Sequence, residues 1–349
     1  MGIVYTLEKY LTRYYRRKIE KKYQKEKKIP SPDMVTWDST RECNLNCEHC
    51  GATEENYEDR LDTEEVKEFI NTMSEIGSGF LSITGGEPLL REDIFRILEH
   101  AESKNVKTGL ATNGFFVDQE TADKLQNKVH SVQISLDGKK ETHNSIKNND
   151  LSFQKATEAL ELLKERKIPV LMASTTVTKT NIDELEDIKK HLIELEIKNW
   201  RINPLMPIGR GKDEQLFPDK DHFRKLFEFI ENTDSVNIKI GENLPYLGEK
   251  EENIRNRPNL CPVGINACCI GVEGNVRGCP EMPDTEKFIE GNIREESFKN
   301  IWQKRFEKYR TNKILKEDSR CSKCDEKYNC YGGCWVMRQA KYQCIRDLI

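Results

Sequence analysis

Short apolar segments alternate with amphipathic segments between residues 34 and 205. The apolar segments are six to nine residues long, a length that is typical of strands buried in a parallel sheet. They predict strands at 34–39, 79–84, 106–112, 131–136, 169–177 and 199–205. Between them, apolar residues recur with helical spacing, which predicts helices at 64–76, 92–103, 119–127, 153–165 and 182–195.

Two of these helices carry start signals. Asp62 with Glu65, and Asn181 with Glu184, each combine a capping side chain with a carboxylate in the first turn of the helix. The six strand–helix units predict an α/β fold, either an open parallel sheet or a partial (β/α)6 TIM-type barrel. In both architectures, functional groups are expected at the carboxyl ends of the strands.

The pattern changes on both sides of this core. Residues 8–28 predict a basic helix whose charges face solvent. The segment after the core is charged and helical in pattern, and beyond it the periodicity is lost and Cys, Gly and Pro dominate, which is typical of a small module held by its cysteines. We therefore expect an extension, a core domain, a helical bridge and a cysteine-rich module at 1–33, 34–215, 216–258 and 259–349.

The chain has 349 residues, a formal net charge of −4 and twelve cysteines. This charge gives no general case for binding nucleic acid or a membrane surface, and no apolar run approaches the ~20 residues that span a bilayer. The first residues lack the apolar core of a signal peptide, so the cysteines point to metal or redox chemistry in a reducing compartment. We therefore expect a cytoplasmic protein.

Three cysteines, Cys43, Cys47 and Cys50, follow the first predicted strand, and no fourth cysteine is near them in the sequence. A loop in this place can hold a four-iron cluster by three of its irons. The fourth iron is then open to a ligand, as one position is open in catalytic zinc sites. The alternative is a zinc site that is completed by His49 or by a distant residue.

The spacing C-x3-C-x2-C resembles the signature of the radical S-adenosylmethionine (SAM) superfamily. The resemblance implies that the open iron binds SAM, whose reductive cleavage gives a 5′-deoxyadenosyl radical that takes a hydrogen atom from the substrate. Segments at the ends of later predicted strands match the family in the same order. They imply SAM contacts from Gly85, Gly86, Glu87, Pro88, Thr112, Asn113, Ser135, Asp137 and Arg210.

The family also suggests what some of these residues contact. The Gly-Gly-Glu-Pro segment at 85–88 holds the methionine amine in the family, and the segment with Arg210 lies near the adenine. Lys147 stands where the family often has an arginine. A lysine cannot bind a carboxylate with two parallel hydrogen bonds as an arginine does, so the resemblance implies for Lys147 only a simple contact with a carboxylate. His49 is expected to pack or to make a hydrogen bond beside the cluster.

The other nine cysteines resemble those of a SPASM domain, which binds two auxiliary four-iron clusters. The resemblance implies one cluster on Cys321, Cys324, Cys330 and Cys344 and another on Cys261, Cys279 and Cys334, with Cys268 or Cys269 as the fourth ligand. Adjacent residues of a strand point to opposite faces, so only one of this last pair is expected to be a ligand. The alternative is a zinc module of the knuckle type.

One departure from the family concerns the residue after Cys279. Sulfatase-maturing members place an acidic base directly after the corresponding cysteine. Here Pro280 follows and Glu281 comes next, which argues against sulfatase maturation. Glu281 is kept as a candidate acid or base, and the alternative is a solvated surface carboxylate.

The two resemblances together imply a radical SAM enzyme with a SPASM module, three four-iron clusters, SAM, and a flavodoxin- or ferredoxin-type reductant. SPASM proteins most often crosslink, oxidise or epimerise peptides, so we expect a peptide or protein substrate. With only 33 residues before the first strand, a peptide would be recognised without an N-terminal leader-binding domain. The alternatives are side-chain modification of a tetrapyrrole on a route to haem, and a non-catalytic protein that binds zinc or a cluster.

Overall fold

The computed structural model describes residues 2–26, 29–51, 59–241, 243–244, 246–255, 260–311, 313–339 and 344. A ten-stranded sheet forms the centre, in the order β10-β9-β8-β1-β2-β3-β4-β5-β6-β7. The strands from β8 to β7 are all parallel, and β9 and β10 continue the sheet antiparallel. The strands are β1 (Met34–Asp38), β2 (Phe80–Thr84), β3 (Lys107–Thr112), β4 (Ser131–Ser135), β5 (Val170–Val177), β6 (Asn199–Pro204), β7 (Asn237–Ile240), β8 (Ala267–Ile270), β9 (Asn275–Arg277) and β10 (Gly291–Asn292).

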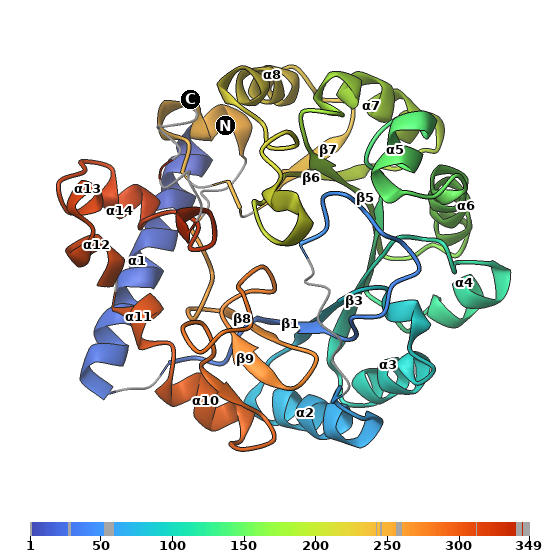
Figure 1. Cartoon of the computed structure of the whole chain (residues 1–349). Coiled ribbons are helices and arrows are strands. Elements are labelled where there is room, and N and C mark those ends of the chain that lie inside the picture. Colours follow the sequence, from blue (N-terminus) through green and yellow to red (C-terminus); the bar gives the residue numbers. More distant parts are fainter. Residues whose placement is uncertain are drawn as a thin grey trace.

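The helices of the core lie outside the curved sheet, as Figure 1 shows. They are α2 (Thr63–Ile76), α3 (Ile94–Ser103), α4 (Gln119–Leu125), α5 (Lys140–Lys147), α6 (Ser152–Glu165), α7 (Leu185–Glu194) and α8 (Lys220–Glu231). The six predicted strands and the strand–helix alternation are confirmed as β1 to β6, in a TIM-barrel-like sheet. None of the described helices is long and apolar enough to cross a membrane.

The capping that was predicted at two helix starts is confirmed at one of them. Asp62 caps α2 and forms a full capping box with Glu65. Asn181 also lies at the predicted start, as the N-cap residue of the 3-10 turn Ile182–Glu184 that leads into α7, but its side chain makes no cap hydrogen bond. Its amide instead accepts a hydrogen bond from Thr178 N and donates to the carbonyl of Asp137, so it fastens the end of β5 to the end of β4.

The sheet extends beyond the six predicted strands at both edges. Strand β7 lies within the segment that was expected to be only a helical bridge, and it pairs with β6. It is four residues long and exposes Asn237 and Lys239, so it lacks the buried apolar run that marks a strand in sequence. Strand β8 belongs to the cysteine-rich segment but pairs with β1. The module is therefore built onto the core sheet, although we expected it to be separate.

The two faces of the sheet differ in chemistry. On β6, Trp200 and Ile202 are buried toward the helices, and Trp200 packs edge-on against Phe229 of α8. Arg201 and Asn203 alternate with them, so they point to the inner face. The register places Arg201 beside Ser174 and Lys239. The inner face is therefore polar and charged at this edge, which is unusual for a sheet that only needs packing.

The C-terminal module follows β10 as short helices. They are α10 (Phe298–Lys304), α11 (Glu307–Arg310), α12 (Lys313–Glu317), α13 (Ser319–Ser322) and α14 (Lys327–Cys330), and α9 (Glu251–Ile254) precedes β8. Short 3-10 turns connect the longer elements, at η1 (Pro88–Leu90), η2 (Ile182–Glu184), η3 (Gly209–Lys212), η4 (Gly248–Lys250) and η5 (Met337–Gln339).

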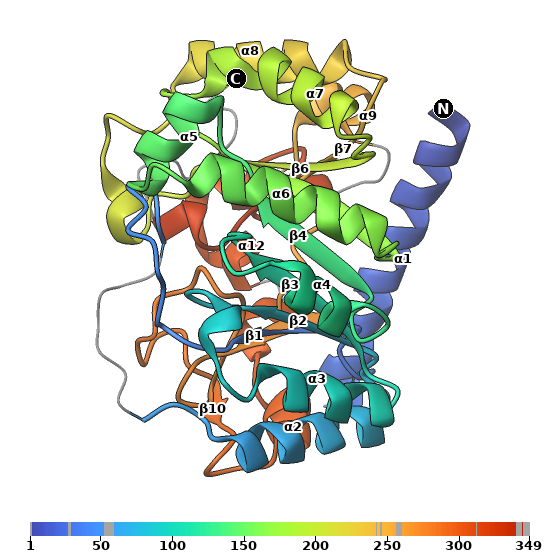
Figure 2. The same ribbon diagram turned by 90° about the vertical axis from the view of Figure 1, so that its right-hand side faces the viewer.

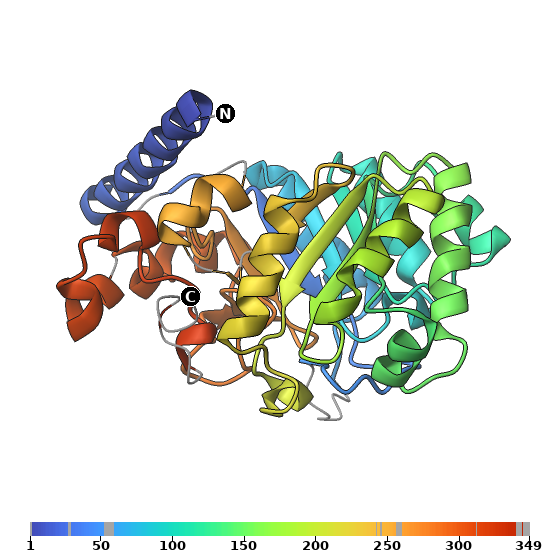
Figure 3. The same cartoon turned by 90° about the horizontal axis from the view of Figure 1, so that it is seen from above.

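Helix α1 (Gly2–Glu26) lies along this module, as Figures 1 and 3 show. We expected a solvent-facing basic helix, and this holds for only one side of it. On the other side Arg16, Ile19 and Tyr23 are buried. Since a helix places residues three and four positions apart on one face, this buried stripe joins α1 to the module.

Candidate functional site

The loop with Cys43, Cys47 and Cys50 leaves the carboxyl end of β1, where the fold class predicts function. Figure 2 shows this loop on the side of the sheet where η3 lies. Cys43 is exposed, and the other two cysteines are half-buried. The backbone N–H of Cys50 donates to the carbonyl of Cys47 at 3.3 Å, so the loop is tightly turned at its second half.

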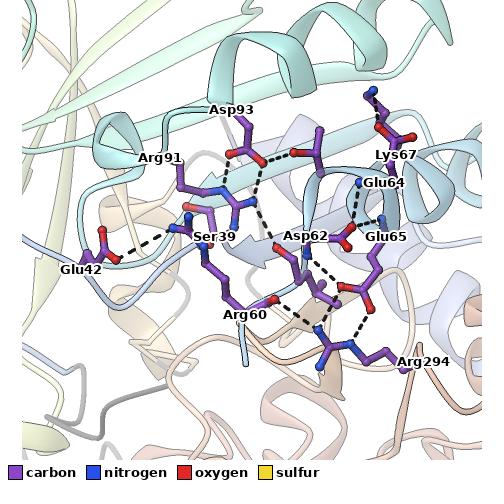
Figure 4. A network of polar contacts seen from close by, with 12 residues as sticks. Ser39, Glu42, Arg60, Asp62, Glu64, Glu65, Lys67, Arg91, Asp93 and Arg294 are labelled. Carbon is purple, nitrogen blue, oxygen red and sulfur yellow. Dashed lines mark hydrogen bonds and ion pairs between the residues drawn. The ribbon is translucent and has the colours of Figure 1, made fainter. Parts of the chain in front are cut away.

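A buried arginine holds both ends of this loop (Figure 4). Arg91 donates to the carbonyl of Ser39, at the start of the loop, at 2.8 Å, and to the carbonyl of Leu61, at its far end, at 3.2 Å. Its other donors reach both carboxylate oxygens of Asp93, at 2.9 and 2.7 Å. The guanidinium also stacks over Trp37 of β1, 5.1 Å from the ring centre. Arg91 was not among the predicted site residues; in the sequence it is an arginine that directly follows the apolar segment PLL.

A second arginine connects the C-terminal module to the same region. Arg294, which follows β10, pairs with Glu65 at 2.6 Å and donates to the carbonyl of Arg60 (Figure 4). It also pairs with Asp59 at 2.7 Å. Glu65 belongs to the capping box of α2. The end of the cysteine loop, the start of α2 and the module are therefore held in one network.

The Gly-Gly-Glu-Pro segment at 85–88 packs directly on the stem of the cysteine loop. Gly86 N donates to the carbonyl of Thr40 at 2.6 Å, and Glu87 N donates to the carbonyl of Glu42 at 2.7 Å. A Cβ on Gly86 would overlap the carbonyl of Glu42. Gly86 therefore allows the backbone of this segment to pack directly against the backbone of the cysteine loop.

The side chain of Glu87 is buried and bonded within the protein. Its carboxylate accepts hydrogen bonds from Thr112 Oγ1 at 2.7 Å, from Asn113 N at 2.8 Å and from Leu89 N at 3.1 Å. It thus joins the end of β2 to the end of β3. Asn113 in turn donates to Asn44 Oδ1, in the cysteine loop, at 2.9 Å. The contact between this segment and a methionine amine stays a prediction.

Lys147 and Asp137 form a buried ion pair, with 2.6 Å between Nζ and Oδ2. Burial alone would raise the pKa of Asp137, but Lys147 and the neighbouring histidines lower it to about 2. Burial would lower the pKa of Lys147, but Asp137 and the thiol of Cys47 raise it above its ordinary value. A charged ammonium group, paired with the carboxylate of Asp137, therefore lies beside the cysteine loop at the end of α5.

Two histidines surround this pair in neutral form. His49 Nε2 lies 3.7 Å from Asp137 Oδ2, and burial lowers the pKa of His49 to about 4. The backbone N–H of Asp137 donates to Nδ1 of His143 at 2.9 Å, and burial lowers the pKa of His143 to about 3. Asp137 Oδ1 accepts from Thr176 N at 2.7 Å. Ser135, two residues earlier, is half-buried at the end of β4 beside Ser174.

The segment that contains Arg210 also contacts the cysteine loop. Arg210 N donates to the carbonyl of Cys50 at 2.9 Å, and its Nε donates to the carbonyl of Cys47 at 2.8 Å. Gly209 has a φ of 54°, and a Cβ there would lie 2.6 Å from the carbonyl of Cys50. Several of the predicted site residues are therefore brought together around the loop, from the ends of β2, β3, β4 and β6.

These residues fit a bound iron–sulfur cluster. Asn44 Nδ2 and His49 Nδ1 are buried in the loop without a hydrogen-bond partner among the described residues. The amide nitrogen of Asn44 donates, and Nδ1 of His49 donates in the tautomer that carries the proton there; inorganic sulfide accepts hydrogen bonds. Lys147 and Arg210 add positive charge where thiolates and sulfide would add negative charge. Within the described residues, no three His, Cys, Asp or Glu side chains are close enough together to hold a single metal ion.

The module cysteines fall into two neighbourhoods. Burial raises the pKa of Cys279, and Cys334 and Cys261 lie close enough to raise it further. Burial likewise raises the pKa of Cys330 to about 11, and Cys344 and Cys321 add to it. Buried thiols disfavour ionisation, and a metal centre reverses this because it binds the thiolate.

Cys268 and Cys269 point to opposite faces of β8, as strand geometry requires. Both are buried. Cys269 lies near Asp38 Oδ2, at 3.8 Å, and interacts electrostatically with Arg277. Cys268 lies on the other side, near Arg310. Only Cys269 therefore shares the side of the sheet where Cys279 lies.

A group of charges lines the space between the two cysteine regions. Asp38, the last residue of β1, pairs with Arg277 of β9 at 2.7 Å, and both are buried. Glu281 interacts electrostatically with Asp38 and with Arg201. Burial raises the pKa of Glu281, and Asp38 acts in the same direction. Glu281 is half-buried. It is therefore not the fully solvated surface carboxylate that was the alternative.

Comparisons with known proteins agree with this geometry. The model of the radical SAM superfamily matches residues 37–192, and that of SPASM, an iron–sulfur cluster-binding domain, matches residues 261–325. A mycofactocin maturase MftC from Mycolicibacterium smegmatis is 31% identical over 90% of this chain and 81% of its own length. An AdoMet-dependent heme synthase from Methanosarcina barkeri is 29% identical over 86% of this chain and 91% of its own length.

Solved structures show the same fold. Streptococcus suis SuiB bound to SAM superimposes with a TM-score of 0.73 at 16% identity, over 94% of this chain and 79% of that chain. SuiB bound to its precursor peptide SuiA gives a TM-score of 0.72 at 16% identity, over 94% of this chain and 77% of that chain. The fold of this chain therefore has a counterpart in a solved structure over nearly its whole length.

Proposed function

The chain belongs to the radical SAM superfamily and carries a SPASM domain, and from this premise we propose that it cleaves SAM reductively to modify a peptide. The chemistry that the bound cluster and SAM supply is a 5′-deoxyadenosyl radical, which takes a hydrogen atom from the substrate. The observation that carries the proposal is the three-cysteine loop at the end of β1 with two unpartnered donors buried in it, Asn44 Nδ2 and His49 Nδ1.

In this proposal Cys43, Cys47 and Cys50 ligate the SAM-binding cluster. Asn44 and His49 donate hydrogen bonds to it, and Arg210 holds the carbonyls of Cys47 and Cys50 so that the thiolates stay oriented. The segment at 85–88 supports the same loop from the other side.

The contacts to SAM are proposed for the polar ends of the neighbouring strands. Lys147 is the proposed contact for the carboxylate of SAM. Asp137 holds the ammonium group of Lys147 in place, with 2.6 Å between Oδ2 and Nζ. The segment at 85–88 is the proposed contact for the methionine amine, through atoms other than the Glu87 oxygens that already accept hydrogen bonds. Ser135 is the proposed contact on β4.

Two auxiliary clusters are proposed in the module, which makes three in all. Cys261, Cys269, Cys279 and Cys334 form one proposed ligand set, and the choice of Cys269 over Cys268 is supported by its side of the sheet. Cys321, Cys324, Cys330 and Cys344 form the other.

The substrate is proposed to lie over the inner face, between the cysteine loop and Cys279. Arg201 and Lys239 can bind an anionic group of the substrate there, because both lie on this face in neighbouring register. Glu281 is proposed to move a proton, and its support is positional: it lies between Cys279 and the Asp38–Arg277 pair.

A peptide substrate is supported by the relative from M. smegmatis, whose name describes it as a maturase of mycofactocin. SuiB, which has a similar fold, supports the same substrate class, because it has been solved with SAM and, in a separate structure, with its precursor peptide. A flavodoxin- or ferredoxin-type protein is the proposed reductant.

Modification of a tetrapyrrole is the second candidate. It is favoured by the relative from M. barkeri, which is named a heme synthase and is matched over 91% of its length. The cations at Arg201 and Lys239 are compatible with it, because acidic side chains of a tetrapyrrole need positive partners.

One experiment distinguishes the two. Reconstituted protein is incubated without oxygen with SAM and a low-potential reductant, and either any short peptide that is encoded beside the gene or iron coproporphyrin is added. The proposal predicts a mass change of the peptide in step with 5′-deoxyadenosine, and none with Cys47→Ala. A changed porphyrin beside an unchanged peptide, in ordinary water and in heavy water, would establish the second candidate.

A further inference from the structure

Helix α1 buries one arginine against the C-terminal module. Arg16 is 5% exposed, and its Nη1 donates to the carbonyl of Cys261 at 2.9 Å. Its guanidinium lies over the ring of Tyr331, 4.5 Å from the ring centre. Its Nε is buried and has no hydrogen-bond partner among the described residues.

This burial is not balanced by a carboxylate. No described Asp or Glu forms an ion pair with Arg16, and the acidic residue that acts on it electrostatically is Glu20, one turn along the same helix. A buried cation without a paired anion is costly, so such a site normally serves a negative charge that comes from elsewhere.

The neighbouring tyrosine, Tyr331, also has a buried polar group without a hydrogen-bond partner among the described residues. This group is its hydroxyl, and the residue is 3% exposed. Tyr331 directly follows Cys330, and Arg16 contacts Cys261, so the two donors lie between the two proposed ligand sets. The other set has an arginine too, because Arg338 Nη1 lies 3.3 Å from the sulfur of Cys321.

We propose that Arg16 is the positive charge that stabilises the auxiliary cluster held by Cys261, Cys269, Cys279 and Cys334, and that α1 thereby contributes to the function of the module. A cluster on thiolates is anionic and gains one more negative charge when it takes up an electron from the reductant, so a nearby guanidinium favours the reduced form. The inference rests on the proposed function, because it needs that cluster to be present.

The expected effect is on the reduction potential. At an effective dielectric constant of about 20, a unit charge roughly 10 Å from a cluster changes the equilibrium between its oxidation states on the order of tenfold. For a one-electron couple, a tenfold change is about 59 mV. Arg16→Gln should therefore lower the potential of this cluster by that amount, and Arg16→Lys should shift it less.

Arg17 offers a matched control. It is the next residue of the same helix, is exposed, and stacks over the ring of Tyr328 at 5.2 Å. Arg17→Gln removes the same charge from the solvent side of α1, where water and salt screen it. It should change the equilibrium between the oxidation states of each cluster by no more than about twofold, which is a shift of less than about 20 mV in each potential.

The test is a titration of the full-length reconstituted protein with titanium(III) citrate, followed by electron paramagnetic resonance, with iron counted for every variant. Cys261→Ala identifies the signal of this cluster. A potential that is lower by about 59 mV in Arg16→Gln, and unchanged in Arg17→Gln, supports the inference. Loss of about four irons from Arg16→Gln, while Arg16→Lys keeps them, also supports it. An unchanged potential in a fully loaded Arg16→Gln, or an equal shift with Arg17→Gln, overturns it. If the unmodified protein holds no cluster that Cys261→Ala removes, the proposed function of the module has failed first.

Discussion

The clamp that Arg91 forms on the cysteine loop can be tested by removing it. Arg91→Ala would take away two hydrogen bonds to the carbonyls of Ser39 and Leu61 and would leave Asp93 without its bidentate partner. Breaking a buried pair in this way costs about 3–5 kcal/mol, because an uncompensated charge stays behind. The loop would also lose the contact that fixes both of its ends.

The change in melting temperature follows from the size of the chain. An unfolding entropy of about 2.1 cal/mol/K for each residue gives about 0.7 kcal/mol/K for 349 residues. A loss of about 3–5 kcal/mol then lowers the melting temperature by about 4–7 °C. Arg294→Gln is the control from the same network, because its side chain is 27% exposed and a surface pair is worth about 1 kcal/mol or less.

The assay is a melting curve of the metal-free protein together with the iron content after reconstitution. Arg91→Ala is expected to melt about 4–7 °C lower and to hold about four fewer irons, since the loop would no longer present its three thiolates together. Arg294→Gln is expected to melt within about 2 °C of the unmodified protein. An Arg91→Ala protein with normal melting and normal iron content would refute the clamp.

Three further predictions use other contacts. Gly86→Ala puts a methyl group against the carbonyl of Glu42, so iron bound by the cysteine loop should fall; normal iron content would contradict this close packing. The Cys269→Ala protein should bind less iron and the Cys268→Ala protein should bind the normal amount, because only Cys269 faces the interior near Cys279. The reverse result in an iron analysis would identify Cys268 as the cluster ligand. Burial lowers the pKa of His143 to about 3. Below about pH 6.5 the unfolded chain therefore binds a proton on this histidine that the folded chain does not bind. Stability should therefore fall as the pH drops from about 6.5 toward 3, and His143→Gln should flatten this decline in urea titrations at successive pH values.

Much of the fold was predictable from the sequence because its strands are short, largely apolar segments in which nearly every residue is buried or half-buried. The six predicted strands appear as β1 to β6, and the capping box at Asp62 is present. Strand β7 escaped prediction because it is short and alternates exposed polar residues with half-buried ones. The pairing of β8 with β1 escaped because it joins residues more than 200 positions apart, and no local pattern records such a contact.

The candidate site shows a similar division. Cysteine spacing identified the loop, and the strand ends identified residues such as Asp137 and Arg210 that surround it. Spacing says nothing of what a side chain bonds to. Glu87 is engaged with Thr112 and Asn113, and the guanidinium groups of Arg91 and Arg16 reach carbonyls far along the chain, which only the folded structure brings near them.

The central claim is that the three-cysteine loop supports reductive cleavage of SAM. The most direct measurement is the amount of 5′-deoxyadenosine that anaerobically reconstituted protein forms from SAM and a low-potential reductant, with iron and sulfide counted in the same preparation. The account predicts about twelve irons for each chain, sulfide in equal amount, and 5′-deoxyadenosine that disappears with Cys47→Ala. A preparation that binds one or two zinc ions, holds no sulfide and forms no 5′-deoxyadenosine would contradict it.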